Sequence, residues 1–251
     1  MRRRGSAGLA VTAAAVAVAA GCLADGLLQP AAASPASATP SALVTKALAA
    51  AGTRSFHYVA TTTVGSEAVT IVGDASSRWD DQTATIRQGK GVGILTTRVA
   101  PGGLYYRGNN LGLIEYLRLN SAYTRPFDGK WIYVPTTQQS FASLVHAVSP
   151  AAVLAELSLR GTLSLSNQQL GGTNVVAVRG RGTLLALEGQ TGPATLYLST
   201  GRPSLPVLFV ERGTGVTKRD RLSISFSRWG ERVRVAAPKD TVPASALNPE
   251  G

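Results

Sequence analysis

The chain has 251 residues, of which 44% are hydrophobic, and its formal net charge at pH 7 is +11. It contains a single cysteine and therefore cannot form an intrachain disulfide, which excludes a disulfide-stapled scaffold. The two histidines, His57 and His146, lie far apart in the sequence, and no cluster around them has the spacing of metal ligands.

The first residues have the architecture of an export signal. Residues 2–4 are three arginines, and residues 8–20 form an uncharged stretch made mostly of Ala and Val. Residues 19–22 read Ala-Ala-Gly-Cys, which resembles a bacterial lipobox, although position 19 has Ala in place of the usual Leu. That resemblance implies that residues 1–21 are a lipoprotein signal peptide, and that Cys22 is acylated on its thiol and becomes the mature N-terminus.

Two other interpretations of this segment stay open. Cys22 can be a chance cysteine in an ordinary signal peptide that is cut later, at an Ala-x-Ala site such as 31–33. The apolar run can also remain as a membrane helix, but it is short and falls below the ~20 strongly apolar residues that a span needs. Residues 22–39 are rich in Ala, Ser and Pro and almost uncharged, a composition typical of a tether.

We expect residues 40–251 to form one domain, because one hydrophobic core serves chains of up to ~250 residues. Removal of the three leader arginines leaves 22 basic and 14 acidic residues, a net charge of +8. Outside the cell, such a charge favours anionic lipid headgroups or cell-wall polymers over nucleic acid. A solvated surface explains the charge equally well.

The domain begins with a predicted helix over 40–51, which Thr39 caps and Gly52 ends. Alternating, β-branched runs separated by Gly and Asp then predict antiparallel strands. These strands are expected at 55–64, 67–73, 78–87, 93–99 and 104–107. The segment 89–93 lacks the spacing of a phosphate-binding loop and predicts a hairpin turn.

The middle of the domain has helical periodicity. A helix is expected over 111–119, followed by a short strand at 130–134. Thr136 and Gln139 have the spacing of a capping box, ahead of an amphipathic helix that ends near Val148. Ser149-Pro150 predicts the start of another short helix. After Gly161, strands are expected at 162–166, 174–179, 182–187, 194–199, 205–212 and 219–228.

These elements predict an α+β fold in which an extended antiparallel sheet brackets central amphipathic helices. A sheet with one apolar face must cover that face with helices, close on itself or leave a groove. An apolar cavity results if the helices do not fill the space, although each candidate residue can also be ordinary core. The candidate lining residues are Phe56, Tyr58, Leu113, Leu117, Phe141, Leu144, Val148, Leu154, Leu222, Ile224 and Phe226.

The chain resembles the LolA/LolB-like lipoprotein carriers and the actinobacterial LppX/LprG-type lipoproteins from about Ser41 to Pro243. The resemblance rests on the lipobox, on the order of elements, and on the segments GKWIYVP at 129–135, LYL at 196–198, GRP at 201–203 and FSRWG at 226–230. It implies a half-open antiparallel β-barrel with an N-terminal helix and central lid helices, whose hollow holds or ferries acyl chains. It implies no cofactor and no catalytic residues, and an anchor on the outer face of the cell membrane with an unidentified transporter as a possible partner.

No local pattern favours an enzyme. The sequence has no Gly-x-Ser-x-Gly elbow, and Asp80-Asp81 with Asp74 nearby lack further ligands at the spacing of a cation-binding loop, which favours a turn. A hydrolase stays an open alternative if the fold brings His57 or His146 to a carboxylate and a hydroxyl.

Basic residues crowd the last fifth of the domain, where Glu and Asp offset them only in part. At the rim of a cavity, guanidinium groups could hold phosphate or sugar-phosphate headgroups, while solvated strand faces are the simpler explanation. The candidate headgroup residues are Arg202, Arg219, Arg221 and Arg228. Three functions therefore stay open: a carrier or chaperone for a lipid, glycolipid or lipidated protein, a structural or interaction lipoprotein of the envelope with a filled core, and an extracytoplasmic hydrolase.

Overall fold

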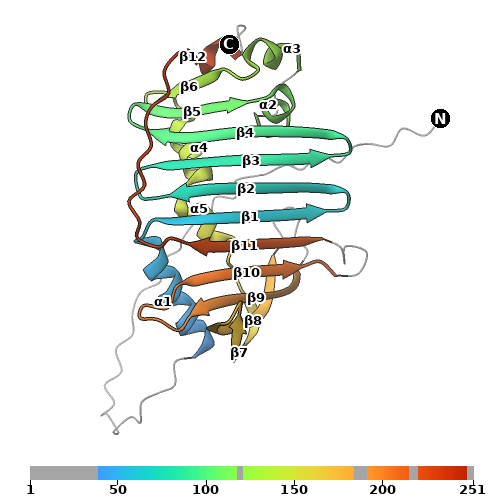
Figure 1. The fold of residues 1–251 in the computed structure, drawn as a ribbon, viewed down its shortest axis with the longest axis vertical. Coiled ribbons are helices and arrows are strands. Elements are labelled where there is room, and N and C mark those ends of the chain that lie inside the picture. Colours follow the sequence, from blue (N-terminus) through green and yellow to red (C-terminus); the bar gives the residue numbers. More distant parts are fainter. Residues whose placement is uncertain (1–38, 118–120, 184–190, 215–219, 248–251) are drawn as a thin grey trace, which may run out of the picture.

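The computed structural model describes residues 39–117, 121–183, 191–214 and 220–247. Its centre is one 12-stranded sheet, which is curved and does not close on itself (Figure 1). Nearly all neighbouring strands run antiparallel, and a few helices pack on the sheet. The predicted α+β class with an extended antiparallel sheet is therefore confirmed.

The first half of the sheet is a series of hairpins that follows helix α1 (Pro40–Gly52). At the start of α1 the Thr39 side chain accepts a hydrogen bond from the amide of Ala42, which satisfies one of the free N–H groups of the first turn. Gly65 and Gly89 adopt positive φ in the tight turns of this half. Its strands are β1 (Phe56–Val64), β2 (Glu67–Ala75), β3 (Asp80–Gln88), β4 (Gly91–Ala100) and β5 (Gly103–Gly108).

The middle of the chain combines short helices with one strand. The predicted capping box is wrong, because the helix after it begins at Phe141 and its N-cap, Ser140, makes no side-chain hydrogen bond. Residues before it instead form turns, in which the amide of Gln138 donates to Pro135 O. The elements are α2 (Asn110–Leu117), α3 (Ser121–Thr124), the 3-10 turn η1 (Arg125–Phe127), β6 (Trp131–Pro135), α4 (Phe141–Val148) and α5 (Pro150–Ala155).

The second half returns to strands. The separate strand expected from Gly182 is wrong where it is described, because Gly182 and Thr183 continue the preceding strand. Gly180 does not break that strand: a Cβ there would lie 2.6 Å from Leu163 Cδ2, so glycine makes room for a neighbouring side chain. The elements are β7 (Arg160–Leu170), β8 (Thr173–Thr183), β9 (Thr191–Ser199), β10 (Pro206–Arg212), β11 (Arg221–Ser227), β12 (Thr241–Pro243) and the 3-10 turn η4 (Ala244–Leu247).

The two halves join through antiparallel pairing of β1 with β11, so the strand order is β12-β6-β5-β4-β3-β2-β1-β11-β10-β9-β8-β7. The exception to antiparallel pairing is β12, which pairs parallel with β6. This C-terminal strand was not predicted. It is reached by residues 228–240, which run along the strand ends from β11 to β12 (Figure 1).

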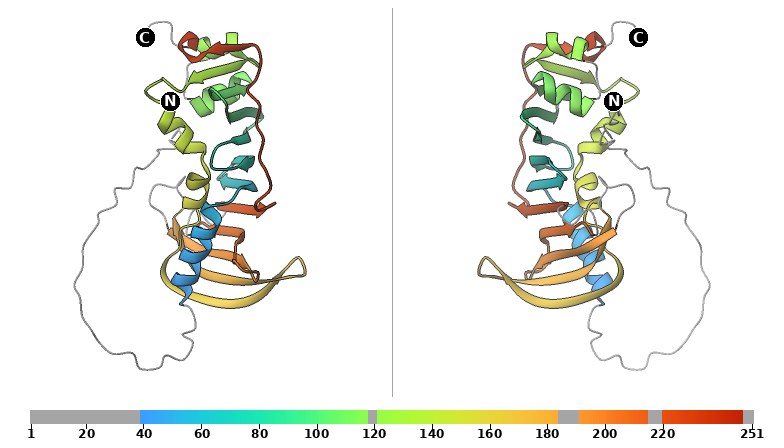
Figure 2. Two further views of the ribbon diagram at one scale, coloured as in Figure 1. Left: turned by 90° about the vertical axis from the view of Figure 1, so that its left-hand side faces the viewer. Right: turned by 90° about the vertical axis from the view of Figure 1, so that its right-hand side faces the viewer.

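Helices α1, α4 and α5 lie on one face of the sheet, which we call the inner face (Figure 2). Strand β3 illustrates the two faces: Gln82, Ala84 and Ile86 are buried on the inner face, whereas Asp81 and Thr83 alternate with them toward the outer face. Residues 228–240 cross on the outer side (Figure 2). The protein is thus a two-layer structure whose outer face carries no helix among the described elements.

Candidate functional site

The predicted cavity-lining residues all belong to the inner layer, but the structure divides them between two apolar clusters. The first, the α1 cluster, contains Phe56, Tyr58, Leu154, Leu222, Ile224 and Phe226. The second, the α4 cluster, contains Leu113 with the partly buried Leu117, Phe141, Leu144 and Val148. The sequence pattern predicted which side chains face inward but gave no sign of this division.

The α1 cluster is tightly packed. Helix α1 buries Ala47 and Ala51 completely against the sheet, where their small side chains allow a close approach. Three aromatic rings meet beside them: the ring centroids of Phe56 and Trp229 are 4.9 Å apart, and those of Phe226 and Trp229 are 5.7 Å apart. Trp229 was not among the predicted residues, because it follows β11 and lies outside its alternating pattern.

The α4 cluster is packed more loosely on its helical side. Helix α4 is amphipathic, with four apolar residues toward the cluster, yet none of its residues is fully buried. The other side of the same cluster is fully buried, since Leu104 and Ile132 on the sheet and Leu113 on α2 have no exposed surface. A buried apolar floor therefore lies under a helix that is only half-buried.

A row of polar side chains lies on the inner face between the clusters. The hydroxyl of Tyr58 donates to Oε1 of Gln82 at 2.5 Å, and Gln82 pairs across β3 and β4 with the buried Thr97. Gly73 makes this arrangement possible, because a Cβ there would lie 2.6 Å from Cε1 of Tyr58. We call Tyr58, Gln82 and Thr97, together with Asp80, the polar seam.

Asp80 is the most unusual member of the seam. It is 2% exposed, and neither of its carboxylate oxygens has a hydrogen-bond partner in the described part of the chain. Burial raises its pKa from 3.8 to about 8, with smaller contributions from Asp81 and Asp74. The turn predicted for Asp80-Asp81 is wrong, because both residues open strand β3 and point to opposite faces, so they cannot share a cation.

Two buried phenols belong to the same region, where Tyr58 interacts with both Asp80 and Tyr116. Burial raises the pKa of Tyr58 well above its usual value, and the charges of Asp80 and Tyr116 raise it further. Burial also raises the pKa of Tyr116, from helix α2, to about 12. Burial therefore favours the protonated, uncharged forms of Asp80, Tyr58 and Tyr116 at neutral pH.

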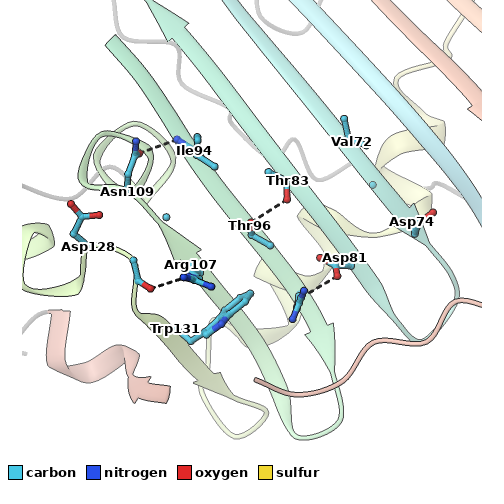
Figure 3. Close-up of a pocket in the computed structure, with 14 residues that line it drawn as sticks. Val72, Asp74, Asp81, Thr83, Ile94, Thr96, Arg107, Asn109, Asp128 and Trp131 are labelled. Atoms are coloured by element: carbon cyan, nitrogen blue, oxygen red, sulfur yellow. Dashed lines mark hydrogen bonds and ion pairs between the residues drawn. The ribbon is translucent and has the colours of Figure 1, made fainter. Parts of the chain in front are cut away.

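The outer face carries an open hollow of about 560 Å³ over β2 to β6 (Figure 3). Two of its charged side chains are paired: Nε of Arg98 lies 3.0 Å from Oδ2 of Asp81, and the guanidinium of Arg98 lies 4.9 Å from the centroid of the Trp131 ring. Arg107 also lies over this ring and donates to the carbonyl of Gly129 (Figure 3). Such partly exposed pairs contribute only ~0.2–1 kcal/mol each, which is typical of a solvated strand face.

A smaller hollow of about 280 Å³ lies under the C-terminal segment and contains His57. Nδ1 of His57 lies 2.9 Å from Oδ1 of Asp74, and Arg228 contacts both side chains. The residues that line this hollow include no serine or threonine, and the cross-strand partner of His57 is Ser227 on β11. His146 is exposed on α4.

The candidate headgroup arginines are not brought together. Arg221 and Arg228 lie at opposite ends of β11 and are exposed, with Arg228 paired to Asp74 at 2.7 Å on the outer side. Arg202 is exposed in the turn between β9 and β10. Arg219 lies outside the described residues, as do Cys22 and the predicted signal peptide and tether.

None of the helices in the described ranges has the length and apolarity that a membrane crossing needs. The same ranges contain no group of three His, Cys, Asp or Glu side chains arranged to hold a metal ion. No protein-family model matches the sequence, and no curated protein matches it significantly.

Proposed function

We propose that this protein is a membrane-anchored, extracytoplasmic lipoprotein that binds or carries a lipid, glycolipid or other acylated ligand. In this proposal the curved sheet is a half-open barrel, α4 and α5 are its lid, and the acyl chains lie between the lid and the inner face. Cys22 carries the lipid anchor, and residues 22–39 are the tether.

The observation that carries the proposal is the incomplete burial of α4. An amphipathic helix that belonged to a filled core would bury its apolar residues, whereas Phe141, Leu144, Val145 and Val148 are all only half-buried. Few fully buried contacts hold this helix, so it is among the elements that move away from the core at least cost. An acyl chain that entered beneath it would gain the apolar floor of Leu104, Leu113 and Ile132.

The proposal is tested by mass spectrometry of organic extracts from the full chain, purified from a lipid-containing bacterial host. Extraction releases only non-covalently bound lipid and leaves an anchor on Cys22 attached. We expect a stoichiometric lipid from the wild-type protein, and at least a fivefold loss from the Leu144→Asp variant, which places a charge under α4.

The matched control is Ala142→Asp, the same charge on the exposed side of the same helix. This variant should retain the lipid, and circular dichroism should show that both variants are folded. Lipid-free wild-type protein from several hosts would contradict the proposal and favour a structural envelope lipoprotein with a filled core.

A further inference from the structure

Asp80 lies where the two apolar clusters meet. In the register of the sheet its neighbours are Ala75 on β2, a buried member of the α1 cluster, and Val99 on β4, which packs on the α4 cluster. The row continues to Phe56 on one side and Leu104 on the other. Asp80 is thus the one acid in a row of otherwise apolar inward side chains.

Asp80 has no hydrogen-bond donor beside it among the described residues. Its two carboxyl oxygens are buried without a hydrogen bond, whereas Asp74 and Asp81 form ion pairs on the outer face. Gln82, two residues further along the same face of β3, already accepts from Tyr58 through Oε1. A buried oxygen without a partner costs free energy, and a ligand that supplies an O–H or N–H group recovers it.

We propose that Asp80 is a specificity-determining residue of the ligand site, where it accepts a hydrogen bond from a hydroxyl or amine at the junction between the apolar arms of the ligand. This inference rests on the proposed function, since it places the ligand against the inner face. One arm then lies on the α1 cluster and the other on the α4 cluster, while the polar seam receives the group that joins them. An amphiphile with no donor at this junction leaves Asp80 unpaired.

The test measures, at pH 9, how well matched ligands displace a pyrene-labelled alkane from the full-length protein. This pH lies above the pKa of Asp80, about 8, so its carboxylate can only accept hydrogen bonds and gives none to an ether oxygen. The ligands are 1,2-dioctanoylglycerol, its 3-O-methyl ether, which lacks only the O–H group, and the 3-amino analogue, which replaces that O–H with an amine. We expect the wild-type protein to bind the hydroxyl or amine ligand about tenfold more tightly than the ether, and the better of the two identifies the donor.

The Asp80→Leu variant should bind the ether as well as the wild-type protein does and lose the preference for a donor. Asp81→Leu is the matched control, because it removes the adjacent carboxylate from the outer face of the same strand, and it should keep the preference. Thermal melts establish that both variants fold.

Failure of the two proposals is distinguishable. If no ligand displaces the probe from the wild-type protein, the carrier function itself is contradicted. If the ether and the donor ligands bind equally well, or if Asp80→Leu keeps the preference, the lipid site stands but the role of Asp80 is overturned, and a buried water then satisfies its carboxyl.

Discussion

The buried carboxyl of Asp80 is expected to make the stability of this protein depend on pH. Burial raises its pKa from 3.8 to about 8, so the folded state binds a proton that the unfolded state releases. The buried carboxyl therefore lowers the free energy of unfolding least below pH 4, where it is protonated in both states. As pH rises from about 4 to about 8, the unfolded state is increasingly favoured and the free energy of unfolding falls. Within that window the wild-type protein should lose about 1.4 kcal/mol per pH unit relative to an Asp80→Asn variant, whose amide has no charge to bury.

Urea unfolding at pH 5, 7 and 9 measures this difference. Burial also raises the pKa of Glu156 to about 7, so this residue contributes to the pH dependence of stability between about pH 4.5 and 7. A Glu156→Gln variant separates its contribution from that of Asp80. Asp81→Asn, on the outer face, should follow the wild-type pH profile. Parallel profiles for the wild-type protein and Asp80→Asn would show that the carboxyl is not buried in solution.

The sequence predicts a residue's role best when that role depends only on residues a few positions away, as in a helix cap. Thr39 and Ser149 lie directly before Pro at the first helical position, and both accept a hydrogen bond from the amide three residues later. For Asp80 the sequence indicates only its orientation: it alternates in phase with Ala84 and Ile86, so it faces the inner side of β3. Its missing partner could not be predicted, because that depends on side chains from β1, β4 and α2.

Strands were predictable as elements wherever alternation extends over six or more residues, as in β11, where Leu222, Ile224 and Phe226 share a face. Which strands pair was harder to predict, since β1 and β11 pair although they lie more than 150 residues apart in the sequence. The C-terminal strand β12 was missed for both reasons: it has only three residues, and its parallel partner β6 lies far away in the sequence.

At the scale of elements, we expect β12 and η4 to be necessary for the stability of the α4 cluster. Val242 and Leu247 pack on this cluster, and β12 covers the edge of β6. Deletion of residues 241–251 should reduce the free energy of unfolding by about 3 kcal/mol, the value of burying two such side chains in part. It should also expose a sheet edge that promotes association.

Urea unfolding and light scattering test this deletion against a shorter one that removes only residues 248–251. The shorter deletion should leave both measurements unchanged. If the two truncated proteins were equally stable and equally monomeric, the pairing of β12 with β6 would not contribute to the fold in solution.

At the scale of the whole molecule, the two faces of the sheet have different chemistry. The inner face combines a tight cluster, a loose cluster and the polar seam, whereas the outer face carries paired, exposed charges such as Arg98 with Asp81 and Arg228 with Asp74. Strand alternation predicted this asymmetry. The curvature of the sheet and the division of the inner layer depend on packing between distant elements, which no local pattern encodes.

The proposed membrane anchor also concerns the whole molecule. A thioether-linked diacylglycerol at Cys22 would supply two acyl chains, and two chains give stable anchoring where one gives only reversible binding. The net charge of +8 after loss of residues 1–21 adds attraction to anionic lipid. We therefore expect the wild-type protein in the membrane fraction of a bacterial host, and Cys22→Ala as an uncleaved precursor, because acylation precedes cleavage at such sites.

Mass spectrometry of the N-terminal peptide separates the three interpretations of this segment. A peptide that begins at Cys22 with two or three acyl chains would establish the lipid anchor. A lipid-free peptide that begins near Ser34 would mean an ordinary signal peptide, and Cys22→Ala would then be processed normally. A peptide that still carries Arg2 to Arg4 would mean that the apolar run is retained in the membrane, and the folded domain would be held by a helix instead of by acyl chains.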